Sequence, residues 1–281
     1  MKSAVVTGAS SGIGLAAAKA LVERGFRVFG SVRKPSDAER LRRELGDRLV
    51  PLLFDVTDGA AVKAAAGQVS QALDGVPLAG LVNNAGVAVP GPLLHLAVDD
   101  FRRQLEINLT GQLIVTQAFA PLLMARNAKA AGRIVMITSV GGRSATPFVG
   151  PYNTSKFGLE GFSEALRREL MIFGIDVIVV APGAVATPIW DKADAVDVSP
   201  YADTVYAPAL EKLKAEMIRL GRQGLPPEKL GRIIAVALTA AKPKTRYVVT
   251  PEPLTYLLLN VLPKRWSDKI FATRLGLTPP R

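Results

Sequence analysis

Cysteine is absent from this 281-residue sequence, and histidine occurs only once, at position 95. A chain without thiols forms no disulfide and offers no thiolate ligand, and His95 alone is too little for a histidine-based metal site. We therefore predict no metal, and we interpret His95 as structural or exposed. The 25 glycines and 20 prolines are scattered, without repeats or low-complexity stretches. With 49% hydrophobic residues, the chain can form one large buried core.

Acidic residues are fewer than basic ones, 24 against 35, so the formal net charge is +11. From position 242 to the end, eight basic residues stand against two acidic ones, and this tail carries +6. A basic excess suits nucleic acid or an anionic membrane surface. The chain lacks a nucleic-acid recognition motif and aromatic residues interleaved with basic ones. We therefore predict no nucleic-acid partner and attribute the charge to a solvated surface and an anionic cofactor.

The N-terminus leaves no room for a signal peptide, because an apolar run that predicts a strand begins at residue 3. We therefore expect a cytoplasmic protein.

That first strand, residues 3–7, leads into a glycine-rich turn and a helical pattern that continues to residue 24. Strand, glycine turn and helix is the order in which such a turn binds a pyrophosphate. Gly8 lets the chain turn, Gly12 permits close backbone approach and Gly14 lets helix and strand pack tightly, while the helix N-terminus attracts phosphate charge. The spacing is G-x-x-x-G-x-G, and a tight turn without a ligand is the alternative.

Residues 25–32 predict the second strand, which Arg33 and Lys34 follow. In a dinucleotide-binding fold this strand ends beside the adenosine ribose, where an acidic residue would bind the 2′-hydroxyl. The next carboxylate along the chain is Asp37, whereas Arg33 offers a planar guanidinium suited to a 2′-phosphate. This pattern favours NADP over NAD; the alternative is that both charges only solvate the loop.

Strands and helices then alternate along the chain, which predicts a parallel sheet with helices on both faces in one doubly wound α/β domain at residues 1–250. The expected helices are residues 36–45, 58–73, 99–126, a tyrosine-bearing helix that begins near 152, and 228–240, and the further strands are residues 49–54, 79–82, 133–138, 175–181 and 246–249.

Several polar or small residues fall where these strands end. Asp55, Asn83, Gly86 and Ser139 all follow strands, at the sheet edge where such folds bind ligands. Asp58 is the natural N-cap of the next helix, so Asp55 is left for another role.

Asn108 lies at the middle of a long predicted helix, where an amide competes for backbone hydrogen bonds. Its position favours a functional or kink-bridging role over a surface one.

Tyr152 and Lys156 are four residues apart on the first turns of an amphipathic helix, so they share one face. A free tyrosine titrates at about pH 10, and moving its pKa to neutrality requires roughly 4 kcal/mol. A neighbouring Lys, helped by a cofactor charge, could supply that stabilisation and make Tyr152 a general acid/base. Taken alone, the pair is also compatible with an ordinary helix surface.

Two segments fall outside the regular alternation. Residues 189–227 mix aromatic, apolar and charged side chains around a predicted helix at 208–220, and we interpret them as a substrate lid. Residues 251–281 form an apolar and basic extension, whose nine-residue segment 254–262 is too short to span a bilayer. It can cover a cleft, pack in a dimer or lie on a membrane, and we favour burial within or between chains over membrane contact.

Together these elements resemble the short-chain dehydrogenase/reductase family, over roughly residues 3–240. The resemblance is carried by Thr7-Gly8-(x)₃-Gly12-Ile13-Gly14, Asp55-Val56, Asn83-Asn84-Ala85-Gly86, Asn108, Ser139, Tyr152-(x)₃-Lys156 and Pro182-Gly183-(x)₃-Thr187, which come in the family's order. The lid, Arg33 and the tail look most like the hydroxysteroid and retinol dehydrogenase branch. The resemblance implies a seven-stranded Rossmann sheet of order 3-2-1-4-5-6-7 and hydride transfer between NAD(P) and an alcohol or carbonyl. The Arg33 pattern favours NADP over NAD as that cofactor.

The resemblance also implies the site residues. Tyr152 would transfer the proton, Lys156 would lower its pKa and hold the nicotinamide ribose, Ser139 would bind the substrate oxygen, and Asn108 would fix the kinked helix and a water relay. The implied cofactor-binding residues are Gly8, Ser10, Ser11, Gly12, Ile13, Gly14, Arg33, Asp55, Val56, Asn83, Ala85, Gly86, Lys156, Pro182, Gly183, Val185 and Thr187.

Three functional hypotheses follow. We favour an NADP(H)-dependent oxidoreductase, a homodimer or homotetramer, for a bulky apolar alcohol or ketone of steroid, retinoid or lipid type, with at most weak peripheral membrane contact through the tail. A cofactor-binding sensor of the same fold without turnover is the alternative, although all four catalytic positions are filled. A nucleic-acid binder is suggested by charge alone.

Overall fold

The computed structural model describes residues 1–124 and 131–279 and contains a seven-stranded parallel sheet. The strands stand in the order β3-β2-β1-β4-β5-β6-β7, and each neighbouring pair runs parallel. This confirms the predicted doubly wound sheet. The strands are β1 Ser3–Val6, β2 Arg27–Val32, β3 Leu49–Leu53, β4 Gly80–Asn83, β5 Arg133–Ile137, β6 Asp176–Pro182 and β7 Arg246–Val249.

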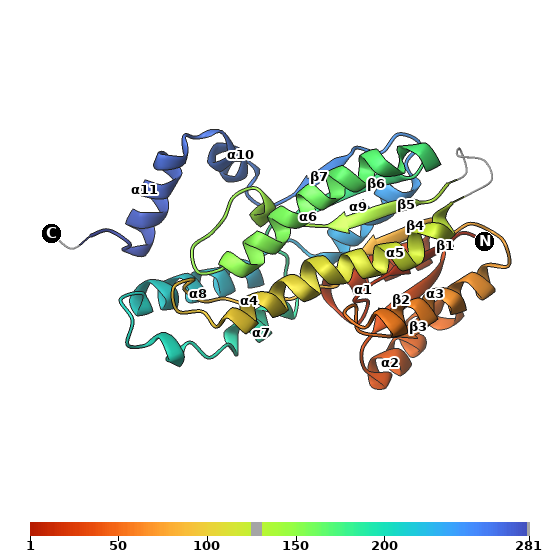
Figure 1. The fold of residues 1–281 in the computed structure, drawn as a ribbon, viewed down its shortest axis with the longest axis horizontal. Helices are drawn as coiled ribbons and strands as arrows, with labels where there is room; N and C mark the ends of the chain where they lie inside the picture. The colour runs from red at the N-terminus through yellow and green to blue at the C-terminus, as the bar shows by residue number, and fades with distance from the viewer. Residues whose placement is uncertain (125–130, 280–281) are drawn as a thin grey trace.

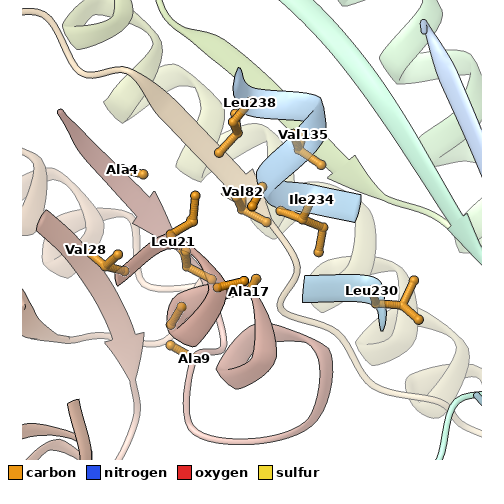
Figure 2. Close-up of a cluster of buried hydrophobic side chains, with 14 of the residues drawn as sticks. Ala4, Ala9, Ala17, Leu21, Val28, Val82, Val135, Leu230, Ile234 and Leu238 are labelled. Carbon is orange, nitrogen blue, oxygen red and sulfur yellow. The ribbon is translucent and has the colours of Figure 1, made fainter. Parts of the chain in front are cut away.

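Successive strand residues point to opposite faces of the sheet, so the nearly continuous apolar strands build a core on each side. On one face Val28, Val82 and Val135 pack with Leu21 and Ile234 (Figure 2). The helices that contribute to this core are α1 Gly12–Glu23, α2 Pro35–Leu45 and α9 Pro227–Thr239.

On the other face Phe29, Leu81 and Met136 pack with Phe119 and Leu159. The helices of this layer are α3 Gly59–Leu73, α5 Gly111–Leu123 and α6 Gly150–Glu169. As expected, Asp58 caps α3, since its carboxylate accepts the N–H of Ala61. Because helices cover both faces of the sheet, the ends of the strands are the part left for a ligand site.

The long helix expected at residues 99–126 is broken into three pieces. Helix α4 (Val98–Leu105) passes into a π-helical turn, Glu106–Thr110, and then into α5. The described helix ends at Leu123, where Met124 is extended; Arg126 lies outside the described residues. Such a π-turn is common at functional sites, and Asn108 lies within it.

The lid and the tail gather at the end of the sheet away from the N-terminus (Figure 1). The lid holds α7 Ile189–Asp194 and α8 Ala207–Arg222, and the tail holds α10 Pro253–Val261 and α11 Lys264–Leu275. A small third core joins Phe148, Leu210 and Leu213 to Leu275 of the tail. No helix in residues 1–124 or 131–279 is long and apolar enough to cross a membrane.

Candidate active site

One cavity of about 730 Å³ lies at the carboxyl ends of the strands. Its walls come from the glycine turn, the ends of β2 to β6, the start of α6, the lid and the tail. Asn108, Ser139, Tyr152 and Lys156 all line it, so folding brings residues of the π-turn, the end of β5 and α6 to one cavity.

The glycine turn forms one end of this cavity. Gly8 and Gly12 have φ angles of 65° and 57°, which other residues rarely adopt. A Cβ on Gly14 would lie 2.2 Å from the Gly8 carbonyl oxygen, so the helix can approach the strand only with glycine there. The first turn of α1 carries no acidic side chain, and among the described residues Ser11 makes no side-chain capping bond. The N-terminal amides are therefore suited to an anion.

Thr7 and Asn84 hold this turn against the end of β4. The Asn84 amide donates to the Thr7 carbonyl at 2.9 Å and to the Gly8 carbonyl at 3.3 Å, and the Thr7 hydroxyl accepts from the N–H groups of Asn84 and Ala85. Sequence reasoning did not identify this role for Thr7 or Asn84. Their positions after two different strands were the available signal.

A polar stripe also runs along α4, the π-turn and α5 with a spacing of four residues. Gln104 bonds Val87 and Val89, Asn108 bonds Val87, and Gln112 bonds the Ala85 carbonyl. Among the described residues, the loop after β4 has no neighbouring strand to bond its backbone N–H and C=O groups. The side-chain amides of these three residues bond those groups instead. Only Asn108 was singled out from the sequence; the i and i+4 spacing of Gln104 and Gln112 could have revealed the others.

Asn108 also reaches α6, since its amide donates to the Ser155 hydroxyl at 3.1 Å. Ser155 precedes Lys156 in α6, so the π-turn positions that helix directly. Asn108 is 1% exposed and its amide is fully engaged by protein groups.

Two of the expected cofactor residues do not line the cavity. Asn83 is turned into the core, where its amide donates to Thr116 and to the Met136 sulfur. Its side chain therefore holds β4 against α5. Gly14 acts through packing alone. All the other expected cofactor residues do line the cavity.

Ser139, Tyr152 and Lys156 lie close together in the cavity wall. The Ser139 hydroxyl accepts the Gly141 N–H at 3.0 Å and lies within 3.5 Å of the Pro182 carbonyl oxygen. The Lys156 ammonium donates to the Ile137 carbonyl at 2.8 Å and lies 5.8 Å from the Tyr152 ring centroid. The Tyr152 phenol, which can donate a proton, therefore lies close to the Ser139 hydroxyl and the Lys156 ammonium.

The expected lowering of the tyrosine pKa does not occur in this structure. Burial raises the pKa of Tyr152, and a hydrogen bond with Ser139 offsets part of that effect. Burial also lowers the pKa of Lys156 to about 8, although Glu160 acts to raise it. Desolvation penalises both the Tyr152 phenolate and the Lys156 ammonium. The ammonium lies over the Tyr152 ring and not at the phenol oxygen, so its stabilisation of the phenolate does not offset this penalty.

Arg33 and Asp55 meet at the rim of the cavity. The Arg33 guanidinium lies 3.8 Å from the Asp55 carboxylate, and both side chains are well exposed to solvent. Burial acts to raise the pKa of Asp55, but hydrogen bonds from Thr57 and the charge of Arg33 bring it below its ordinary value. Asp55 therefore remains ionised at neutral pH and holds Arg33 near the end of β2.

His95 was interpreted from the sequence as structural or exposed, and in the structure it is exposed. Its ring lies edge-on to Tyr206, with 5.8 Å between the ring centroids.

Lys156 leads to a prediction about the cofactor-free protein. Between about pH 8 and 10.5 the unfolded chain binds more protons at this position than the folded chain, so stability rises with pH across that window. Below pH 8 the buried ammonium costs ~3 kcal/mol. Replacing Lys156 by Met should therefore raise the free energy of unfolding at pH 7 by up to about that amount, less the lost bond to Ile137.

Urea unfolding at pH 7 and pH 9.5 measures this effect, and the gain should shrink at the higher pH. Lys63→Met on the exposed surface of α3 is the matched control. A Lys156→Met variant that behaves like the control at both pH values would show that the buried ammonium is not penalised.

Comparisons with known proteins agree with this geometry. The family model described as short chain dehydrogenase matches residues 2–197. An NADPH-dependent 3-dehydrocapnine reductase of Ornithobacterium rhinotracheale is 40% identical over 273 residues, 96% of each chain. Human retinol dehydrogenase 5 is 41% identical over 254 residues, 86% of this chain and 78% of that one.

Solved structures show the same fold. A short-chain dehydrogenase from Streptomyces avermitilis superposes with a TM-score of 0.76 at 28% identity, covering 98% of this chain and 96% of that one. A Burkholderia phymatum enzyme, solved in complex with NAD, has a TM-score of 0.79 at 24% identity, covering 100% and 97%. The chain thus belongs to the short-chain dehydrogenase/reductase family, in the branch that includes the retinol dehydrogenases. It is an oxidoreductase of alcohol and carbonyl groups with a nicotinamide cofactor.

Proposed function

We propose that this enzyme transfers a hydride between NADP(H) and a bulky apolar alcohol or ketone of steroid, retinoid or lipid type. The observation that carries the proposal is that one cavity is lined by both kinds of residue. The glycine turn, Arg33 and the Ser139–Tyr152–Lys156 group line it, and so do apolar residues of the lid and the tail. Its volume of about 730 Å³ lies within the range of small-molecule sites.

The residues present fit a dinucleotide. The glycine turn and the amides that open α1 would hold the pyrophosphate, and Val185 with Thr187 would hold the carboxamide end. A bound cofactor would supply or accept the hydride, while the protein supplies orientation and electrostatics. Arg33 would bind a 2′-phosphate, which supports NADP over NAD. The reductase relative described as NADPH-dependent gives the same direction.

The proton would move through Tyr152. In reduction its hydroxyl donates to the carbonyl oxygen, and in oxidation its phenolate accepts from the alcohol. Ser139 would donate a hydrogen bond to the same oxygen as charge develops. A raised pKa keeps Tyr152 protonated at neutral pH in the free protein, which suits the acid role.

The proposed substrate class rests on the apolar part of the cavity lining. This part includes Phe148, Leu210, Leu213, Met217 and Leu259, of which Leu210, Leu213 and Met217 come from α8. Such a surface favours an extended apolar molecule that presents one oxygen to Tyr152.

A single screen tests the proposal: NADPH and NADH absorbance with steroid, retinoid and fatty carbonyl substrates. Turnover of at least one class, faster with NADPH, is the expected result. NADPH binding without turnover of any substrate, in either direction, would instead support a cofactor-binding sensor.

The tail also supports a proposal of self-association. Its segment faces both ways: Leu259 lines the cavity, while Leu254, Leu257 and Val261 are 80%, 58% and 68% exposed. The predicted burial is therefore not found within this chain, where none of the residues of α10 is buried. We propose that a second copy covers the other side in a homodimer or homotetramer in the cytoplasm. Sedimentation should show a salt-insensitive oligomer; salt-sensitive flotation on anionic liposomes would favour a membrane surface instead.

A further inference from the structure

Helix α10 borders the cavity and has few attachments to the rest of the chain. All its residues are described, and none of them is buried. Thr255, Tyr256 and Leu259 nevertheless line the cavity. Something other than core packing must therefore hold α10 in place.

The following helix, α11, is attached firmly to the lid. Arg274 pairs with Glu216 of α8, and Leu275 is buried against Ala209, Leu210 and Leu213. This anchor fixes the far end of the tail. Near the other end of α10, the attachment is polar.

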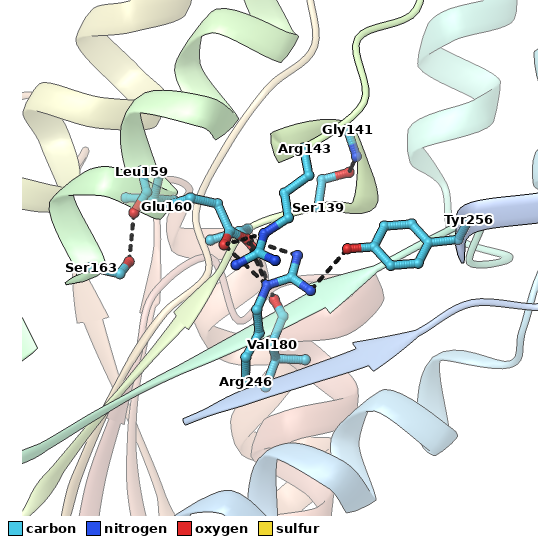
Figure 3. Close-up of polar contacts among 10 residues, drawn as sticks. Ser139, Gly141, Arg143, Leu159, Glu160, Ser163, Val180, Arg246 and Tyr256 are labelled. Atoms are coloured by element: carbon cyan, nitrogen blue, oxygen red, sulfur yellow. Dashed lines mark hydrogen bonds and ion pairs between the residues drawn. The ribbon is translucent and has the colours of Figure 1, made fainter. Parts of the chain in front are cut away.

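The Tyr256 hydroxyl accepts a hydrogen bond from the Arg246 guanidinium at 3.0 Å (Figure 3). Arg246 in turn donates to both carboxylate oxygens of Glu160, at 3.0 and 3.1 Å. Arg246 and Glu160 are only 15% and 13% exposed, so solvent screens their pairing weakly. Within the described residues, no other α10 side chain is hydrogen-bonded to another element.

The Glu160 carboxylate is held by other partners besides Arg246. It accepts the Thr138 hydroxyl at 2.7 Å, pairs with Arg143 at 3.6 Å, and lies one turn beyond Lys156 on α6. Thr138 precedes Ser139. The carboxylate that orients Arg246 is therefore fixed to the same two elements that carry the catalytic side chains.

We propose that Glu160, Arg246 and Tyr256 form a latch that holds α10 over the cavity and makes Tyr256 a specificity-determining residue for large substrates. A large substrate needs the wall that α10 forms, whereas a small ketone at Tyr152 does not reach it. The latch positions this wall relative to α6. The inference rests on the proposed function, since it assigns the substrate-size preference of that site.

The test uses Tyr256→Phe, which keeps the ring and removes only the hydroxyl. Tyr247→Phe is the matched control, because Tyr247 lies next to Arg246, bonds only the Lys244 N–H among the described residues, and does not line the cavity. Hydrogen exchange of the 253–261 amides should become about tenfold faster in Tyr256→Phe and remain unchanged in Tyr247→Phe, as expected for the loss of a hydrogen bond to a charged group.

Kinetics supply the second readout. In Tyr256→Phe the KM for a steroid- or retinoid-sized carbonyl should rise about tenfold, while kcat, the KM for cyclohexanone and the NADPH Kd are unchanged. Equal exchange rates in both variants would overturn the latch. Faster exchange with an unchanged KM for the large substrate would overturn the specificity role. If the unmodified enzyme turned over no substrate, the proposed function would fail while the exchange result still decided whether the latch exists.

Discussion

Replacing Tyr152 by Phe is expected to lower kcat by about 10² to 10⁴, the range for loss of a general acid/base. The ring remains, so the packing around Lys156 and Ser139 is kept, while the hydroxyl is lost together with its transferable proton and its hydrogen bond with Ser139. The Kd for NADPH, measured by fluorescence titration, should stay within about twofold of the unmodified enzyme, since the proposed binding groups, the glycine turn and Arg33, are unchanged.

Tyr247→Phe controls for the substitution itself, because it makes the same chemical change outside the cavity. Comparing kcat for both variants at several pH values separates a lost proton donor from a shifted pH optimum. If Tyr152→Phe retained substantial activity at every pH in a clean preparation, another group would have to donate the proton.

The second large effect is expected at Arg33. Arg33→Asp replaces a guanidinium that is 3.8 Å from Asp55 with a second carboxylate at the same rim. The two negative charges should repel a 2′-phosphate, while the new carboxylate can accept a hydrogen bond from a 2′-hydroxyl. The ratio of kcat/KM for NADPH to that for NADH should fall by about 10², because a charge-assisted hydrogen bond is lost on one side and a new one forms on the other.

Lys34→Asp is the matched control, since it changes the net charge equally at the next residue, which does not line the cavity. Arg33→Gln should give an intermediate ratio, because it removes the attraction without adding repulsion. If Lys34→Asp lowered the NADPH/NADH ratio of kcat/KM as much as Arg33→Asp does, Arg33 would act only as part of the general surface charge.

The fold was predictable because its determinants are local. Apolar runs and helical periodicity alternate along the chain, and this alternation in turn implies a parallel sheet. The glycine turn could be interpreted residue by residue, since Gly8 and Gly14 act on the backbone within a few positions. The π-turn around Asn108 was less accessible, because its hydrogen bonds go to a loop some twenty residues away.

The sequence alone therefore determined the fold class, the order of the strands through the family resemblance, and four residues that meet in one cavity, Asn108, Ser139, Tyr152 and Lys156. Tertiary structure decided everything that depends on distance and burial. Asn83 is turned away from the cavity because its amide bonds Thr116 in the core. The pKa of Tyr152 is raised because the fold buries its hydroxyl away from water. The Glu160–Arg246 pair spans 86 residues of sequence, so only the folded structure shows that α10 is tied to α6.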